Sequence, residues 1–234
     1  MRADWSIEER AGTAAELHAG WTPTDPGVRS VACCRVVRPA VVLGSTQADS
    51  VVDPAAARRA GLEVARRRSG GGAVLVAPGD PVWIDAWVPR DDRWWDDDVA
   101  RAFDWLGATW ARALVTLGHP DATPHRGAYA ACTRWCSLIC FGGVGSGEVT
   151  VGGGRKVVGL SQRRTRAGAW FHGACLLHWE PSPLLVAVDL PETDRVAARD
   201  DLAATVVGLN DVAGPGTVPV DRAAVEAAFL GSLP

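Results

Sequence analysis

Two hydrophobic periodicities run through this chain and predict two kinds of element. Residues 96–117 carry apolar side chains at intervals of three and four, which is the pattern of a helix with one buried stripe. In residues 82–88, small aliphatic side chains alternate with tryptophan and aspartate, which is typical of a sheet strand. Similar patterns predict strands at 35–44, at both ends of 62–76, and at 137–141, 148–151, 155–162 and 169–179, and helices at 54–60, 182–188, 193–207 and 221–230.

The order of these elements predicts the fold class. Strands outnumber helices and do not alternate strictly with them, which favours an α+β protein: a mixed β-sheet with helices on one face and at the ends. The 234 residues are enough for one large domain. We therefore expect residues 1–234 to form a single domain, with a core at about 36–190 and a helical C-terminal tail.

Composition narrows the class of protein. The chain is 47% hydrophobic and 22% charged, which excludes intrinsic disorder. A net charge of −3 argues against a nucleic-acid binder that works through bulk charge. No apolar run reaches transmembrane length, and the first ten residues do not form a secretory signal. We expect a soluble, cytoplasmic protein with no nucleic-acid or membrane partner.

The chain has six cysteines, and three of them, Cys132, Cys136 and Cys140, recur every four residues. This spacing would align them on one face of a helix, where small buried thiols pack as hydrophobes. A cytoplasmic chain would keep them reduced. We expect no metal site here, because zinc would need further ligands in a recognised spacing.

Arginine and lysine are used very unequally in this chain: 23 residues are Arg, and only Lys156 is Lys. A genome that disfavours Lys codons explains the missing lysines. It does not explain the one that remains, since Arg replaces a solvated Lys readily but not one whose compact ammonium is required. Lys156 follows Arg155 and a triple glycine, and precedes a strand-like run. An ammonium there could stabilise charge that develops during acyl transfer.

A second candidate site lies between two predicted strands, where Arg66, Arg67 and Arg68 precede Ser69 and three glycines. Consecutive glycines let the backbone approach a ligand closely, and successive N–H groups can bind an anion. Adjacent guanidinium groups match phosphate or carboxylate geometry. The alternative is a basic, flexible turn. The glycines of residues 142–147 fit no phosphate-loop pattern and indicate a turn.

At these positions the sequence resembles the lipoate–protein ligase A group of the biotin/lipoate ligase superfamily. Residues 66–74 match R-R-x-S-G-G-G-A-V. Residues 154–159 match the G-R-K-[hydrophobic]-x-G part of the family's G-R-K-[hydrophobic]-x-G-S motif, and Leu160-Ser161 follow. His172-Gly173 matches the family's H-G element, and residues 42–47 match V-I-G-x-x-Q. The resemblance implies a fold like the catalytic domains of class II aminoacyl-tRNA synthetases.

The resemblance also implies a reaction: lipoate or octanoate is activated with ATP and Mg²⁺ as acyl-AMP and then transferred to a lysine of an acceptor domain. The implied acceptors are lipoyl domains of 2-oxoacid dehydrogenases or the glycine cleavage H protein. Lys156 is the implied catalytic residue. The residues implied to bind ATP and the acyl-adenylate are Arg67, Ser69, Gly70, Gly71, Gly72, Ala73, Val74, Leu75, Lys156, Gly159, Ser161 and His172.

Departures from the family pattern keep two alternatives open. The family usually has H-D-x-G-N directly after the glycine-rich motif, but residues 76–80 read V-A-P-G-D here. The family also often has an N-D pair before the G-R-K strand, and Gly147-Glu148 stands in its place. We expect no C-terminal accessory domain, which leaves room for a separate accessory subunit. Cys140-Phe141 matches the C-F pair of ATP-independent octanoyltransferases, in which Cys140 would be the nucleophile. The third hypothesis is a non-catalytic binder of lipoyl groups or adenylates.

Overall fold

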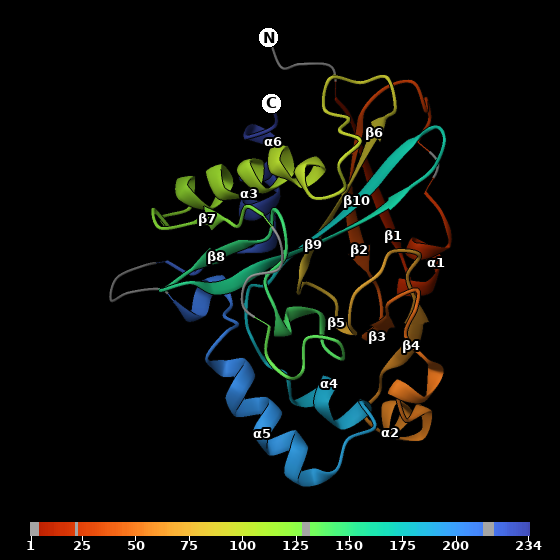
Figure 1. The fold of residues 1–234 in the computed structure, drawn as a ribbon, viewed down its shortest axis with the longest axis vertical. Helices are drawn as coiled ribbons and strands as arrows, with labels where there is room; N and C mark the ends of the chain where they lie inside the picture. Colours follow the sequence, from red (N-terminus) through yellow and green to blue (C-terminus); the bar gives the residue numbers. More distant parts are fainter. Residues whose placement is uncertain (1–4, 22, 128–131, 213–217) are drawn as a thin grey trace.

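The computed structural model describes residues 5–21, 23–127, 132–212 and 218–234, and the strands within them form two sheets (Figure 1). The larger sheet has the order β1-β2-β6-β10-β9-β8-β7, and the smaller has β4-β3-β5. Paired strands are antiparallel except β1–β2 and β3–β4, which are parallel. A mixed sheet with flanking helices confirms the predicted α+β class.

The strands are β1 (Ser6–Gly12), β2 (Ser30–Val36), β3 (Ala40–Leu43), β4 (Glu63–Arg66), β5 (Val74–Val76), β6 (Val82–Pro89), β7 (Thr123–Pro124), β8 (Val149–Val151), β9 (Arg155–Arg164) and β10 (Gly168–Cys175). The α-helices are α1 (Ala14–Ala19), α2 (Pro54–Arg59), α3 (Asp104–Thr116), α4 (Ser182–Ala187), α5 (Glu192–Ala203) and α6 (Arg222–Gly231). Short 3-10 helices lie at η1 (Asp49–Val51), η2 (Arg101–Phe103), η3 (Cys140–Gly142) and η4 (Leu209–Asp211).

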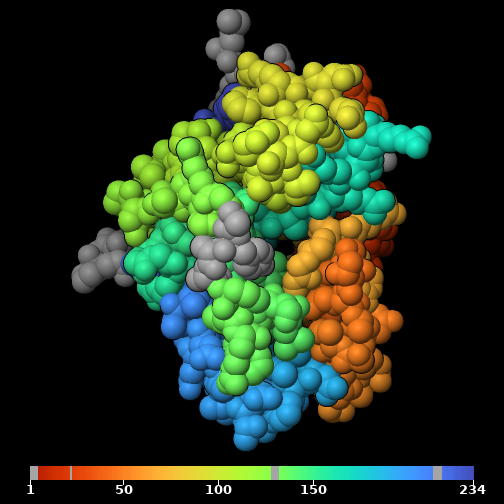
Figure 2. Space-filling view, in the orientation of Figure 1, coloured from red at the N-terminus to blue at the C-terminus, as the bar shows by residue number. Residues whose placement is uncertain are grey.

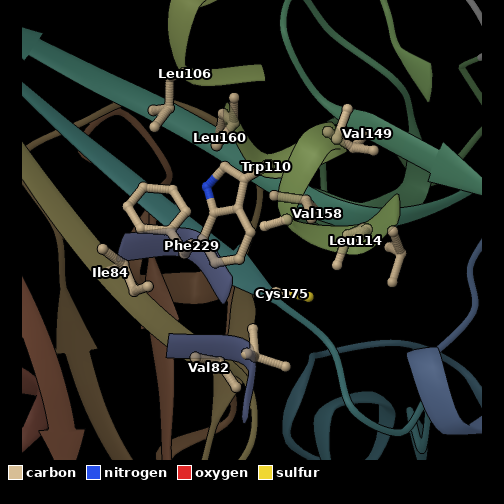
Figure 3. Close-up of a cluster of buried hydrophobic side chains, with 14 of the residues drawn as sticks. Val82, Ile84, Leu106, Trp110, Leu114, Val149, Val158, Leu160, Cys175 and Phe229 are labelled. Carbon is tan, nitrogen blue, oxygen red and sulfur yellow. The ribbon is translucent and has the colours of Figure 1, made fainter. Parts of the chain in front are cut away.

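Helices α3 and α6 pack on one face of the larger sheet. The rings of Trp110 and Phe229 lie 4.5 Å apart over the strand residues Ile84 and Val158 (Figure 3). Burying aromatic side chains of this size contributes about 2–3 kcal/mol each, so this cluster anchors both helices. The smaller sheet packs with α2, α4 and α5 in a second cluster at the other end of the molecule (Figure 1).

The strand predicted at 35–44 is in fact two strands in different sheets. Strand β2 ends at Val36 and β3 begins at Ala40. Pro39 lies between them, and proline cannot donate a ladder hydrogen bond. The break separates the two sheets, and it places the loop after β3 beside the glycine-rich segment.

The helix predicted at 96–117 begins later than expected. The carboxylates of Asp96 and Asp98 accept hydrogen bonds from backbone N–H groups two or three residues ahead, which forms turns. The chain then passes through η2 into α3. Side-chain competition with the backbone therefore delays the helix until Asp104.

Two other predicted strands differ from the structure. Residues 137–141 are not a strand but lead into η3, and Ile139 forms an isolated bridge to Ala73. Strand β10 ends at Cys175, four residues before the predicted end. The strand predicted at 82–88 is confirmed as β6, which is buried at every position because α3 packs on one side and the cluster that includes Leu17 of α1 packs on the other.

Candidate functional site

The glycine-rich segment crosses from β4 to β5, which lie on opposite sides of β3. Glycine is required there by the neighbouring backbone. A Cβ on Gly72 would lie 2.6 Å from the carbonyl carbon of Ile139, and one on Gly44 would lie 1.9 Å from the Gly71 oxygen. Gly71 also has φ +98°, which favours glycine. The N–H of Ala73 donates to the Leu138 carbonyl, and the Ala73 carbonyl accepts from the N–H of Cys140, so the loop lies against the start of η3.

Arg67 supports this loop from inside. Its side chain is 4% exposed, and its guanidinium donates to the carbonyls of Val42, Gly70 and Gly72 at 2.8–3.2 Å. Arg66 likewise donates to carbonyls of the loop after β3. The guanidinium groups of Arg66 and Arg67, which we expected to face an anion, thus hydrogen-bond to backbone carbonyls and stabilise the loop. Arg68 is exposed.

Lys156 lies on β9 and is 1% exposed. Its Nζ is 2.6 Å from the carboxylate of Glu148, and it donates to the carbonyls of Cys140 and Gly143, each at 2.9 Å. The ammonium also lies 4.9 Å from the centre of the Phe141 ring. An ammonium has three N–H donors, and all three are engaged.

In the sequence, Glu148 stands out only because it occupies the place of the Asp in the family's N-D pair. Its carboxylate accepts hydrogen bonds from the backbone N–H groups of Gly145 and Leu160 as well as the Lys156 ion pair. It is 5% exposed. The side chain therefore joins the loop before β8 to β9 and holds the only lysine of the chain.

The two predicted motifs meet directly. The Ser69 hydroxyl, in the glycine-rich loop, lies 2.9 Å from the Ser161 hydroxyl on β9. Ser161 is in register with His172 on β10, and His172 is in register with Asp85 on β6. The structure thus brings the serine-glycine loop, the G-R-K strand and the H-G element to one face of the larger sheet.

His172 is held by a buried carboxylate. Its Nδ1 donates to Asp85 Oδ1 at 2.7 Å, and the indole N–H of Trp83 donates to the same oxygen. Burial raises the pKa of Asp85, but the charge and hydrogen bond of His172 outweigh it, so the net shift is downward. His18 packs against Trp83 with ring centres 4.4 Å apart. The sequence contains a hint of Asp85, which is the one charged residue in an otherwise apolar predicted strand. Nothing in the sequence around His18 indicates that it belongs to the site.

Two neighbouring cavities lie at these residues. A cavity of about 300 Å³ is lined by the three loop glycines, Phe103, Ser146, Glu148 and Gln162. A smaller, narrower one of about 40 Å³ is lined by Val74, Trp83, Phe141, Gly159 and His172. Both are also lined by Cys140, Leu160 and Ser161, which mark their junction. Figure 2 shows a hollow in the surface between the orange segment and the green and teal ones.

A third cavity, of about 190 Å³, lies on the other side of Phe141, and it was not predicted. Its lining is mostly apolar, with Leu75 of β5, Leu184 of α4 and Trp179 among the residues. Leu75, which the family resemblance placed at the adenylate, faces this cavity instead of the two neighbouring ones.

The cysteine prediction was wrong in two respects. Residues 132–140 do not form an α-helix, and Cys132 and Cys136 are joined by a disulfide. Cys132 is exposed instead of buried. Cys140 is a free, half-buried thiol at the start of η3.

The part of the chain that the structure describes contains no cluster of three or more His, Cys, Asp or Glu side chains placed to hold a metal ion. Within the same residues, no helix combines the length and apolar character needed to cross a membrane.

A family model for the lipoyl protein ligase A/B catalytic domain matches residues 27–233. The chain belongs to this family. No curated protein matches it at a significant level. The predicted family is thereby confirmed.

Solved structures of lipoyl protein ligases share the fold. A bipartite lipoate–protein ligase from Thermoplasma acidophilum, described with its lipoyl domain, has a TM-score of 0.74 and 19% identity over 98% of this chain and 82% of that one. A lipoate–protein ligase A bound with ATP has a TM-score of 0.70 and 20% identity over 99% and 84%. A second Thermoplasma acidophilum structure, a putative lipoate protein ligase with bound lipoic acid, has a TM-score of 0.64 and 21% identity over 92% and 74%.

Proposed function

We propose that this protein is an ATP-dependent lipoate–protein ligase. It converts lipoate or octanoate and ATP to acyl-AMP and pyrophosphate, and then transfers the acyl group to a lysine of an acceptor domain. One observation carries the proposal: Cys140, whose carbonyl accepts a hydrogen bond from the buried Lys156 ammonium, lines both a larger, glycine-lined cavity and a smaller, more apolar one.

The two cavities suit the two halves of an acyl-adenylate. The cavity beside Gly70, Gly71 and Gly72 is open to backbone approach and takes the nucleotide. The narrower cavity beside Val74 and Trp83 takes the hydrocarbon chain. The carboxylate and the α-phosphate then meet at the junction, next to Ser161 and Lys156.

Lys156 has a defined task at that junction. Its ammonium stabilises the negative charge that develops on the acyl and phosphate oxygens as the new bond forms. All three of its donors are already used, so a substrate oxygen has to displace one acceptor. The Glu148 carboxylate is the partner to be displaced, because it retains the N–H donors of Gly145 and Leu160 when the ammonium turns away.

Mg²⁺ is part of the proposal because it shields the triphosphate during attack by a carboxylate. Glu148 is the carboxylate that lines the larger cavity, and it is already engaged by Lys156 and two backbone N–H groups. The ion would therefore be held chiefly by phosphate oxygens.

The proposed acceptors are lipoyl domains of 2-oxoacid dehydrogenases or the glycine cleavage H protein. The bipartite relative from Thermoplasma acidophilum, described with a lipoyl domain, supports this class of partner. It also supports a separate accessory subunit as the counterpart of an accessory domain.

The alternative is an octanoyltransferase that forms a thioester on Cys140. It is favoured by the position of this free thiol, which lines both cavities. A nucleophilic thiol needs a nearby cation to lower its pKa. The nearest candidate, Lys156, is neutralised by Glu148, which favours the ligase.

ATP–pyrophosphate exchange that depends on lipoate or octanoate tests the proposal. We expect exchange in the wild type and a loss on the order of 10²–10³ in Lys156→Met. Arg166→Met, which removes an exposed cation from the turn between β9 and β10, is the matched control and should exchange normally. No exchange, combined with an octanoyl adduct on Cys140 from octanoyl-carrier protein, would establish the transferase instead.

A further inference from the structure

A row of polar side chains crosses the sheet beneath the narrower cavity. Ser161, His172 and Asp85 occupy consecutive register positions on β9, β10 and β6. Neighbouring strands are about 5 Å apart, so the row reaches about 10 Å from the junction near Lys156. The cavity that receives the acyl chain therefore starts at Ser161 and runs toward His172.

The far end of this cavity is formed by His18, on α1. The side chain is 8% exposed and lines both the acyl cavity and a further cavity of about 80 Å³ beyond it. Its ring packs on Trp83 and lies edge-on to His172, with ring centres 5.3 Å apart. Its Nδ1 is buried and has no hydrogen-bond partner among the residues that the structure describes.

Both imidazoles are prepared to bind a hydrogen-bonding group. Burial, followed by the charge of His172, lowers the pKa of His18 to about 3, so this ring is neutral and has one donor and one acceptor nitrogen. The Asp85 carboxylate fixes the proton of His172 on Nδ1, which leaves Nε2 directed away from the carboxylate.

A methyl group at this position could not hydrogen-bond to either imidazole, whereas a hydroxyl group can act as donor or acceptor. We propose that the far end of the acyl cavity binds a polar, uncharged end group through His18 and His172. The preferred substrate is then a medium-length carboxylic acid with a hydroxyl-type group at the end opposite the carboxylate. This inference rests on the proposed function, because it assumes that the carboxylate lies at Lys156.

Calorimetric binding of the free acids, without ATP, tests this preference separately from activity. We expect 8-hydroxyoctanoate to bind about tenfold more tightly than octanoate, which corresponds to one net hydrogen bond. Lipoate, whose ring sulfurs are weak acceptors, should bind with intermediate affinity. In His18→Phe, which keeps the ring packed on Trp83, the two octanoates should bind equally. His119→Phe replaces another buried histidine that does not line these cavities, and it should retain the preference.

Two results would overturn the inference. Equal binding of octanoate and 8-hydroxyoctanoate by the wild type would show that the end group is not recognised. Tightest binding by octanedioate would assign the far end to charge pairing with Arg68 and Arg163, which line the cavity beyond His18. If no acid supports pyrophosphate exchange but the hydroxyl preference in binding persists, the ligase proposal fails while this assignment stands.

Discussion

The buried pair of Lys156 and Glu148 makes a quantitative prediction that separates folding from catalysis. Lys156→Met removes the ammonium and keeps the length of the side chain. Glu148 would then be left 5% exposed with no cation, and two backbone N–H groups as its remaining partners. The variant should therefore lose stability as well as activity.

The magnitude follows from the burial of both groups. Breaking a buried ion pair by removing one partner costs about 3–5 kcal/mol, because the other charge is left uncompensated. The Gly145 and Leu160 N–H groups reduce this for Lys156→Met, so we expect about 3 kcal/mol. For a chain of this length that corresponds to a fall in Tm of about 6–12 °C. Glu148→Gln should cost a similar amount, because Lys156 keeps only its two carbonyl partners.

Urea unfolding followed by tryptophan fluorescence measures these free energies. The double variant Lys156→Met/Glu148→Gln should lose less than the sum of the single variants, with a coupling of about 2 kcal/mol. A coupling below about 0.5 kcal/mol would refute the reasoning, because it would mean that the two side chains act independently. In pyrophosphate exchange, Glu148→Gln should retain activity since it keeps the ammonium, whereas both variants without Lys156 should lose it.

Three further predictions test the loop, the buried imidazole and the thiol. Gly72→Ala should lower Tm, because its Cβ would collide with the Ile139 backbone, whereas Gly70→Ala, with open space around it, should not; an equal effect would contradict the packing. The His18 pKa of about 3 means that the unfolded chain takes up a proton below pH 6.5 that the folded protein does not. Stability should therefore fall by about 2 kcal/mol between pH 7 and 5 in the wild type, and by less in His18→Phe; equal losses in urea titrations would refute a neutral buried ring. Cys140→Ser should keep substantial exchange activity, and mass spectrometry of the wild type incubated with octanoyl-carrier protein should find no acyl adduct on Cys140.

The parts of the fold that the sequence predicts are those with a strong local signal. Residues 54–60 begin with proline and end at glycine, and α2 occupies Pro54–Arg59. Strands β8 and β9 lie within a residue or two of their predicted bounds, because glycine turns limit apolar runs there. Predictions fail where local side chains or a distant segment determine the backbone conformation. The aspartates before α3 form turns, and Ile139 pairs with Ala73 only in an isolated bridge before η3 begins.

In the candidate site too, residues within sequence motifs could be predicted, whereas their partners from distant elements could not. Three of the residues that the family resemblance names as binding residues, Ser69, Ser161 and His172, lie at neighbouring positions in the structure. Lys156 lies five residues before Ser161 on β9, and its ammonium contacts the Cys140 carbonyl. The partners of these residues could not be predicted from one sequence, since they come from elements far away along the chain. Asp85 belongs to β6 and reaches His172 only through strand pairing. Glu148 looked like a substitution in a motif, and only its packing shows that it neutralises Lys156.

The geometry around Lys156 also explains why one lysine persists in a chain with 23 arginines. Its Nζ is surrounded by a carboxylate and two carbonyl oxygens from three separate residues, at 2.6–2.9 Å, in a site that is 1% exposed. A compact ammonium directs three donors outward from one atom, which suits acceptors on several sides. A planar guanidinium spreads its donors over a fork and is bulkier, and Gly159 leaves little room because even a Cβ there would lie 3.2 Å from the Phe141 ring. Arginine therefore suffices at positions where only a positive charge is needed, whereas position 156 requires lysine, because one nitrogen has to donate to three acceptors on different sides.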